Sequence, residues 1–215
     1  MTSKAAVNRI IETLKGIYPD GLCSLQYEKD YELLFAVRLS AQCTDERVNK
    51  VTPALYDRFP TLESFAEADP EEVGAYIHSC GFYNGKARDI VACAQKLVNE
   101  YGGKVPGTME ELTGLPGVGR KTANLILGDV FGQPAYVCDT HCIRITGRLG
   151  ITDGSKDPLQ VERQLRERIP PKESNNFCHR MVLFGRDTCT ARSPKCEGCP
   201  LAKDCDTAKS AAKKK

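Results

Sequence analysis

The amino-acid sequence predicts an all-α protein, on two observations. Apolar residues recur at steps of three and four over residues 7–17 and again over residues 87–98, which is the spacing of one buried helix face. Residues that favour helix starts and helix ends punctuate the remaining chain, while strand-like alternation of apolar and polar residues is almost absent. We therefore expect roughly ten short helices.

The expected helix starts and ends can be placed along the chain. Residues 69–72 (D-P-E-E) and 157–160 (D-P-L-Q) each combine an N-cap acceptor, a proline at the first helical position and Glu or Gln at the third. Residues 108–111 (T-M-E-E) form a third capping box, and Asn84 is the expected N-cap of the helix over 87–98. Glycine enters the left-handed helix cap without strain, so five glycines are expected to end helices. They are Gly81, Gly102, Gly103, Gly132 and Gly185.

Composition limits the function classes. The chain has 215 residues, of which 41% are hydrophobic and 27% charged, as is typical of a soluble globular protein. The formal net charge is only +2, so any affinity for nucleic acid must come from local basic patches. No apolar run approaches the roughly 20 residues that cross a bilayer, and no signal-peptide core follows the N-terminus. We expect an intracellular protein of the cytoplasm or nucleoid, with no membrane partner.

Four of the eleven cysteines stand together near the C-terminus, spaced C-x6-C-x2-C-x5-C. In a reducing compartment such a cluster binds metal more often than it forms disulfides. Four soft thiolates suit an iron–sulfur cluster or a structural zinc ion. Common zinc sites pair two C-x2-C knuckles and only one is present here, which disfavours zinc. The other seven cysteines are expected to be small core residues.

A glycine-rich turn, L-P-G-V-G-R-K at residues 115–121, lies between two predicted helices. Gly117 and Gly119 allow close approach of a ligand, and the following helix offers unpaired N–H groups and its positive dipole end. The turn is expected to grip a phosphate, although a tight αα-turn would use the same glycines. Lys121 stands at the mouth of this helix, where the dipole and Arg120 disfavour its charged form, as a nucleophilic amine requires. Simple pairing of Lys121 with a phosphate remains the alternative.

Asp139 ends a Gly- and Pro-containing loop and precedes a predicted helix that contains Ile143, Ile145 and Leu149. It is expected to cap that helix. A capping carboxylate is rigidly aimed, so the same residue can stabilise positive charge and move protons.

The hairpin lysine, the downstream aspartate and the four-cysteine pattern together resemble the endonuclease III family of DNA glycosylases and abasic-site lyases. The resemblance covers about residues 7–205. It implies a [4Fe–4S] cluster held by Cys189, Cys196, Cys199 and Cys205. It also implies excision of oxidised pyrimidines from duplex DNA in base excision repair, by a monomer that cleaves the abasic site by β-elimination. Lys121 would form a Schiff base with the sugar of the flipped nucleotide, while Asp139 stabilises the cationic sugar and assists proton transfer.

Further positions match DNA-contacting residues of the family. Gln42 matches the residue that fills the gap left by the flipped base, and Phe82 stands in the wedge loop where the family often has leucine. Without the resemblance, Gln42 would be only a polar residue at a helix end. The remaining candidates for contact with the DNA backbone are Leu115, Gly117 and Gly119 in the hairpin, His141 and Arg144 after Asp139, and Arg192 and Lys195 between the first two cysteines. A structural role for His141 and Arg144 and a solvated loop for Arg192 and Lys195 are the alternatives.

The family architecture implies two lobes. A six-helix lobe with the hairpin would span 23–133, and a discontinuous cluster lobe would join 1–22 to 134–207. Residues 208–215, which end in three lysines, are expected to be a disordered basic tail.

Two other functions stay open on the sequence. Monofunctional mismatch glycosylases share the hairpin, the aspartate and the cluster, but they generally lack a lysine at position 121 and carry a further C-terminal domain. A non-catalytic DNA-binding module with a structural metal would also use such a hairpin.

Overall fold

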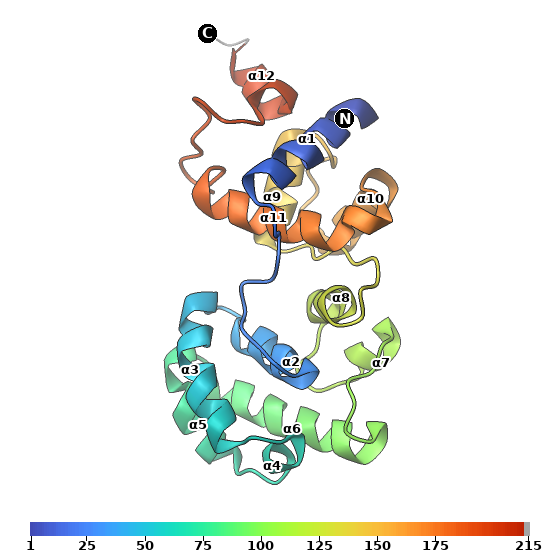
Figure 1. Cartoon of the computed structure of the whole chain (residues 1–215). Helices are drawn as coiled ribbons and strands as arrows, with labels where there is room; N and C mark the ends of the chain where they lie inside the picture. The colour runs from blue at the N-terminus through green and yellow to red at the C-terminus, as the bar shows by residue number, and fades with distance from the viewer. Residues whose placement is uncertain (213–215) are drawn as a thin grey trace. The chain divides into compact units, whose positions relative to one another are not determined.

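The structure, a computed structural model, describes residues 1–212, and all regular structure within that range is helical (Figure 1). The predicted all-α class is confirmed. By its contacts the chain divides into two compact units, Cys23–Gly132 and Met1–Leu22 together with the chain from Gln133 onward. Within the described range, no helix combines the length and the apolar character that a membrane span requires.

The unit Cys23–Gly132 is built around α2 and the long α6. Its elements are α2 (Asp30–Leu39), α3 (Asp45–Arg58), α4 (Leu62–Ala66), α5 (Pro70–Ile77), the 3₁₀ turn η1 (His78–Cys80), α6 (Tyr83–Tyr101), α7 (Met109–Thr113) and α8 (Arg120–Asp129). Helix α2 is buried along nearly its whole length because α3, α6 and α8 all pack against it. Helix α6 buries its predicted apolar stripe, and α4 and α5 pack on it.

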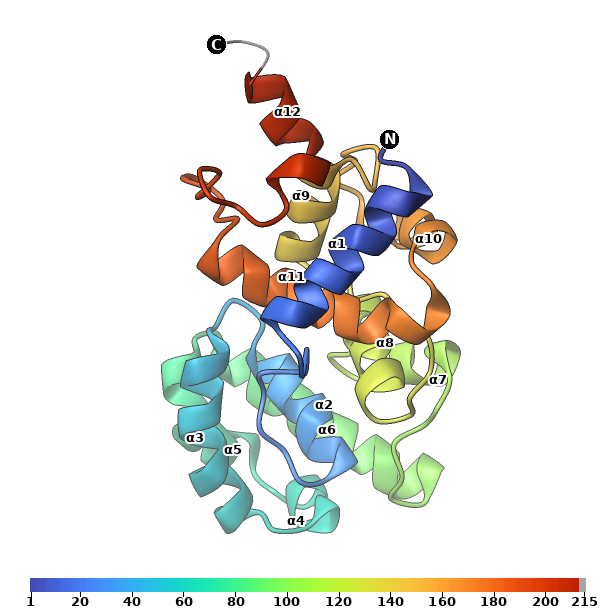
Figure 2. The ribbon, with the colours of Figure 1, turned by 45° about the horizontal axis from the view of Figure 1, so that its top comes forward.

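The other unit combines the N-terminal helix with the chain from Gln133 onward (Figure 2). Its elements are α1 (Lys4–Ile17), α9 (Thr140–Leu149), α10 (Pro158–Arg168), η2 (Pro171–Glu173), α11 (Ser174–Asp187), η3 (Ala202–Asp204) and α12 (Asp206–Ala212). Helices α1 and α9 both pack on α11. The predicted stripe of α1 is buried at Val7, Ile10, Ile11 and Leu14, but Ile17 at the end of the helix is 41% exposed.

The helix starts predicted at residues 69, 108 and 157 are confirmed. Asp69, Thr108 and Asp157 each cap a helix through the side chain, and proline follows the first and third of them. Asn84 is not an N-cap, because α6 already begins at Tyr83, directly after a left-handed Phe82.

Gly185 does not end a helix, contrary to the sequence prediction. It lies buried inside α11, where an added Cβ would come within 2.3 Å of the Nδ1 atom of His141 on α9. The glycine is needed for the close approach of two helices, which the local sequence does not reveal.

The predicted disordered tail is also wrong for residues 208–212. Helix α12 covers Asp206–Ala212, an alanine-rich segment with high helix propensity. The Oγ1 of Thr207 donates to the carbonyl of Arg148 at 3.0 Å, which ties the start of α12 to α9. The last three lysines of the predicted tail lie outside the described residues.

Candidate functional site

The glycine-rich turn joins α7 to α8 as a compact hairpin. Leu115 is its buried anchor, with its N–H donating to Leu112 and its carbonyl accepting from Val118 at 3.2 Å. The Nζ of Lys96 on α6 donates to the carbonyl of Gly114 at 3.1 Å. The hairpin therefore has a fixed position on the unit Cys23–Gly132.

Gly117 is required by both conformation and space. Its φ is +73°, and an added Cβ would lie 2.9 Å from the Nε of Arg38 and from the Cβ of Asp89. Arg38 and Asp89 form an ion pair at 2.6 Å between α2 and α6, and the turn rests on this pair. A side chain at position 117 would have to displace it.

Gly119 plays a different part, because it precedes α8 as a capping residue without a side chain. Its backbone is extended, and a Cβ there would meet nothing within 4 Å. Arg120 and Lys121 begin the helix and are both exposed. The first turn of α8 thus presents backbone N–H groups, the positive dipole end and two cationic side chains on an open surface, as an anion site requires.

We expect Gly117→Ala to lower the free energy of unfolding by about 1–3 kcal/mol, because alanine is strained at positive φ and would press on the ion pair beneath. Displacement of the hairpin should also weaken the binding of duplex DNA by about tenfold, which corresponds to about 1.4 kcal/mol of binding free energy. Thermal unfolding and fluorescence anisotropy with a labelled duplex that contains an abasic analogue would measure the two effects.

Gly119→Ala is the matched control. Its Cβ would enter open space at an allowed φ. The free energy of unfolding should therefore change by no more than about 1 kcal/mol. Equal stabilities of the two variants would contradict the strain assigned to Gly117.

Asp139 lies in the other unit, at the start of α9. Its Oδ1 accepts from the N–H of Cys142 at 2.7 Å, so the predicted N-cap is confirmed. The segment before it is buried and anchored, because the N–H of Ala135 donates to the Oγ of Ser174 at 3.2 Å and the hydroxyl of Tyr136 donates to the carbonyl of Ile169 at 2.8 Å. The carboxylate is half-buried and held by its cap bond, and the chain that leads to it is anchored.

His141 and Arg144 lie one turn apart on α9 and contact each other. The Arg144 Nη2 is 3.2 Å from the His141 Nδ1 and donates to the carbonyl of Cys189 at 2.9 Å. Both side chains are half-buried at the contact between α9 and α11. These contacts give both residues an internal role, and their contact with DNA stays a prediction.

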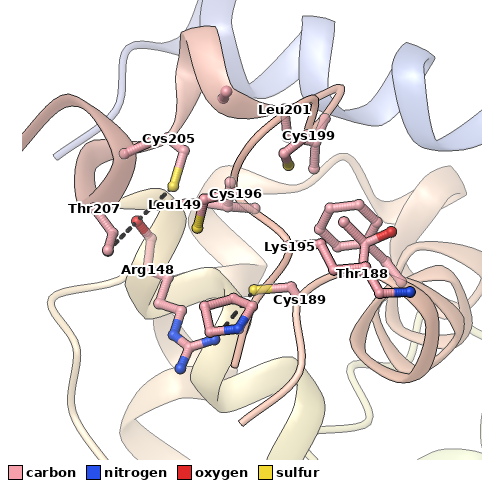
Figure 3. A pocket seen from close by; sticks show the side chains of 14 residues that line it. Arg148, Leu149, Thr188, Cys189, Lys195, Cys196, Cys199, Leu201, Cys205 and Thr207 are labelled. Atoms are coloured by element: carbon pink, nitrogen blue, oxygen red, sulfur yellow. Dashed lines mark hydrogen bonds between the residues drawn. The ribbon is translucent and has the colours of Figure 1, made fainter. Parts of the chain in front are cut away.

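The four predicted ligands surround one pocket at the end of α11 (Figure 3). They are Cys189, Cys196, Cys199 and Cys205. Leu149, Phe184 and Leu201 add apolar side chains to the lining, which also includes Arg148 and Lys195. Burial raises the pKa of the Cys199 thiol, and the other three sulfur atoms add to that effect. A bound metal centre favours the thiolate form of a cysteine and would offset this effect at Cys199.

The spacing of the four sulfur atoms bears on which centre they fit. Among the residues that the structure describes, no three of these sulfur atoms lie within 4.8 Å of one another. A single zinc ion with bonds near 2.3 Å would hold its sulfur ligands about 3.8 Å apart. A cluster binds each cysteine at a separate iron and therefore tolerates a wider arrangement. The pocket fits an iron–sulfur cluster better than a zinc ion.

Arg148 also lines this pocket, and no sequence motif singles it out. Its Nη1 donates to the Cys189 Sγ at 3.3 Å and to the carbonyl of Thr190 at 2.8 Å, and its Nη2 donates to the carbonyl of Ala191 at 2.8 Å. A planar guanidinium suits this set of three acceptors, and it holds the chain between the first two cysteines against α9. Arg148 follows Arg144 by four residues on the same helix face, which was the available sequence signal.

The remaining candidates for DNA contact are on exposed loops. Gln42 follows α2 and Phe82 precedes α6, with Phe82 76% exposed. Arg192 and Lys195 are exposed in the loop between the first two cysteines. Exposure is what a contact with DNA requires, and these roles stay predictions.

Comparisons with known proteins identify similar sequences along nearly the whole chain. A model of the HhH-GPD superfamily of base excision DNA repair proteins matches residues 35–171, and a model of the iron–sulfur binding domain of endonuclease III matches residues 189–205. The chain is 46% identical over 208 residues to endonuclease III of Synechocystis sp., which covers 96% of this chain and 94% of the relative. It is 38% identical over 204 residues to endonuclease III of Escherichia coli strain K12, with 95% and 96% covered.

Solved structures agree with the sequence comparisons. A trapped endonuclease III–DNA covalent intermediate matches with a TM-score of 0.92 and 40% identity, covering 99% of this chain and 100% of that one. A thermostable thymine-DNA glycosylase matches with a TM-score of 0.86 at 21% identity, covering 96% of this chain and 98% of that one, which shows a shared fold.

Proposed function

The chain belongs to the endonuclease III family of base excision DNA repair proteins, and from this membership we propose that it removes oxidised pyrimidines by means of Lys121 and Asp139. The protein is a bifunctional DNA glycosylase and abasic-site lyase, it binds DNA, and it carries a [4Fe–4S] cluster. The base range, the acting residues and the monomeric state are the proposed part. We also propose that it acts in the compartment that holds bacterial DNA, since its relatives named above are bacterial.

The observation that carries the proposal is the exposed Lys121 in the first turn of α8, two residues after Gly119, which is an N-cap without a side chain. A phosphate bound at this helix start would bring a nucleotide next to the Lys121 amine. An amine is needed because its nitrogen can replace the base at C1′ and then form an imine as the C1′–O4′ bond breaks and the sugar ring opens. The imine acidifies the neighbouring C2′–H. Loss of that proton expels the 3′ phosphate and cuts the strand.

Asp139 supplies the negative charge in this proposal. As the base leaves, positive charge develops on the sugar, and a carboxylate fixed by its own cap stabilises that charge without reorganising. The same group can take the proton that the Lys121 amine loses on attack. The two residues belong to different units, so their joint action on one sugar is itself part of the proposal.

The cysteine pocket would hold the cluster through Cys189, Cys196, Cys199 and Cys205, with Arg148 donating to the first of them. When bound, the cluster joins the chain after α11 to the chain before α12. The loop it organises carries Arg192 and Lys195, which we propose contact DNA phosphates.

A panel of duplexes tests the proposed substrates. We expect incision of thymine glycol and other ring-saturated pyrimidines with a β-elimination product on the 3′ side, and about a hundredfold less cleavage at adenine opposite guanine or 8-oxoguanine. Labelled-strand gel assays with and without hot alkali would separate excision from strand cleavage. Alkali-dependent breaks alone, at mismatched adenine, would favour the monofunctional alternative, and tight binding without any excision would favour a non-catalytic module.

A further inference from the structure

Two exposed loops of the unit Cys23–Gly132 share an unusual backbone. Gln42 (φ +54°) and Phe82 (φ +48°) are the non-glycine residues with positive φ in the described chain. A side chain disfavours this conformation, which persists only where the surroundings impose it. Both residues are the ones proposed to enter the DNA duplex. Their surroundings therefore bear on how they are presented.

Both loops begin at a carbonyl held by the same amine. Leu39 ends α2 shortly before Gln42, and Cys80 ends η1 shortly before Phe82. The Lys86 Nζ donates to the Leu39 carbonyl at 2.8 Å and to the Cys80 carbonyl at 2.9 Å. The backbone N–H of Lys86 also donates to the carbonyl of Phe82 at 3.2 Å. One residue of α6 thus fixes the start of both loops.

Lys86 is 1% exposed, which is rare for a lysine and costly unless its charge is well paired. Burial lowers the pKa of Lys86, while the nearby thiols of Cys43 and Cys80 act in the opposite direction. Carbonyls at helix ends lack partners within the helix, so charge-assisted bonds from an ammonium satisfy them strongly. An apolar side chain could fill the same space in the core. The amine of Lys86 therefore serves the two carbonyls that it bonds, which lie at the starts of the two loops.

We propose that Lys86 is a positioning residue that joins the two loops, so that Gln42 and Phe82 enter DNA as one unit. The proposal rests on the proposed function. Filling the gap left by a flipped base and wedging the adjacent step are a joint task, since both must occur while the base is out of the stack. If the loops moved independently, each insertion would have to order its own loop.

Combining variants tests whether Lys86 joins the two loops. We expect Lys86→Met, which keeps the length of the side chain and removes the donors, to reduce kcat/KM on a thymine-glycol duplex by about tenfold. Gln42→Ala should cost about tenfold in the wild-type background and less than about twofold in the Lys86→Met background. Phe82→Ala should behave in the same way. The proposal would be overturned if Gln42→Ala and Phe82→Ala each reduced kcat/KM by the same factor in the Lys86→Met background as in wild type.

Val91→Ala is the matched control for simple destabilisation. Val91 is buried on the same helix and contacts neither loop carbonyl through a hydrogen bond, so this variant lowers stability without cutting the link. Gln42→Ala should retain its full cost in the Val91→Ala background, at a temperature where the two variants are equally folded. The same loss of epistasis in Val91→Ala would assign the effect to stability alone and reject the positioning role.

Amide hydrogen exchange of the free holoprotein gives a readout that does not depend on the reaction. Peptides over residues 40–44 and 81–85 should exchange at least about tenfold faster in Lys86→Met than in wild type. In Val91→Ala their exchange rates should equal those of wild type. Unchanged exchange in Lys86→Met would overturn the inference even if the enzyme is active. Faster exchange in a protein that incises no lesion would instead reject the proposed function and keep the structural link.

Discussion

Lys121→Gln is expected to abolish the covalent adduct that borohydride traps between the protein and an abasic duplex. Strand cleavage should fall by at least about a thousandfold, because removal of a nucleophile removes the covalent route and leaves only binding and electrostatic effects. The glutamine keeps a polar side chain of similar size on an exposed helix turn, so the fold should not change. Adduct formation on denaturing gels and single-turnover cleavage rates would measure both losses.

Two controls make this result specific. Lys104→Gln removes an exposed lysine of the same unit that lies outside the hairpin, and it should trap as wild type does. Lys121→Gln should still bind an abasic-analogue duplex, since the backbone N–H groups of α8 remain. An adduct of normal yield in Lys121→Gln would place the nucleophile at another amine.

Asp139→Asn separates the two parts that this residue is proposed to play. Asparagine caps helices as well as aspartate does, so the bond to the Cys142 N–H and the stability should both be retained. The negative charge is lost, and excision should fall by about 10²–10⁴, the range typical of a general acid or base. Single-turnover excision of thymine glycol and thermal unfolding would be compared side by side.

A third variant completes the comparison for this position. Asp139→Ala loses both cap and charge, so it should be as inactive as Asp139→Asn and also less stable, by about 0.5–2 kcal/mol. If Asp139→Asn excised bases at the wild-type rate, Asp139 would be a cap and nothing more.

Most helix boundaries could be predicted because their causes are local. Asp69, Thr108, Asp139 and Asp157 each cap a helix with an oxygen that reaches an N–H two or three residues ahead. Such bonds depend on a few neighbouring residues and are visible in the sequence. Gly185 shows the limit, since its need for space comes from His141 on another helix.

The candidate site divides in the same way. The spacing of the four cysteines and the hairpin motif are contained in short segments, so both could be predicted from the sequence. Lys86 and Arg148 were missed because their acceptors, at Leu39 and Cys189, lie 47 and 41 residues away along the chain. A lysine inside an apolar helix stripe gives no sign of such distant partners, and the spacing of Arg144 and Arg148 indicates a shared helix face without showing what that face contacts.

The sequence by itself determined the helical class, the helix caps, the four thiols of the metal pocket and a lysine behind a glycine-rich turn. Each of these depends on residue type and on spacing within about two helical turns, where backbone geometry leaves few choices. The tertiary structure alone decided that Gly117 rests on the Arg38–Asp89 pair, that α12 is helical against α9, and that one buried amine joins two loops. These contacts join segments far apart in the chain, and only the packing of the folded units brings their atoms within bonding distance.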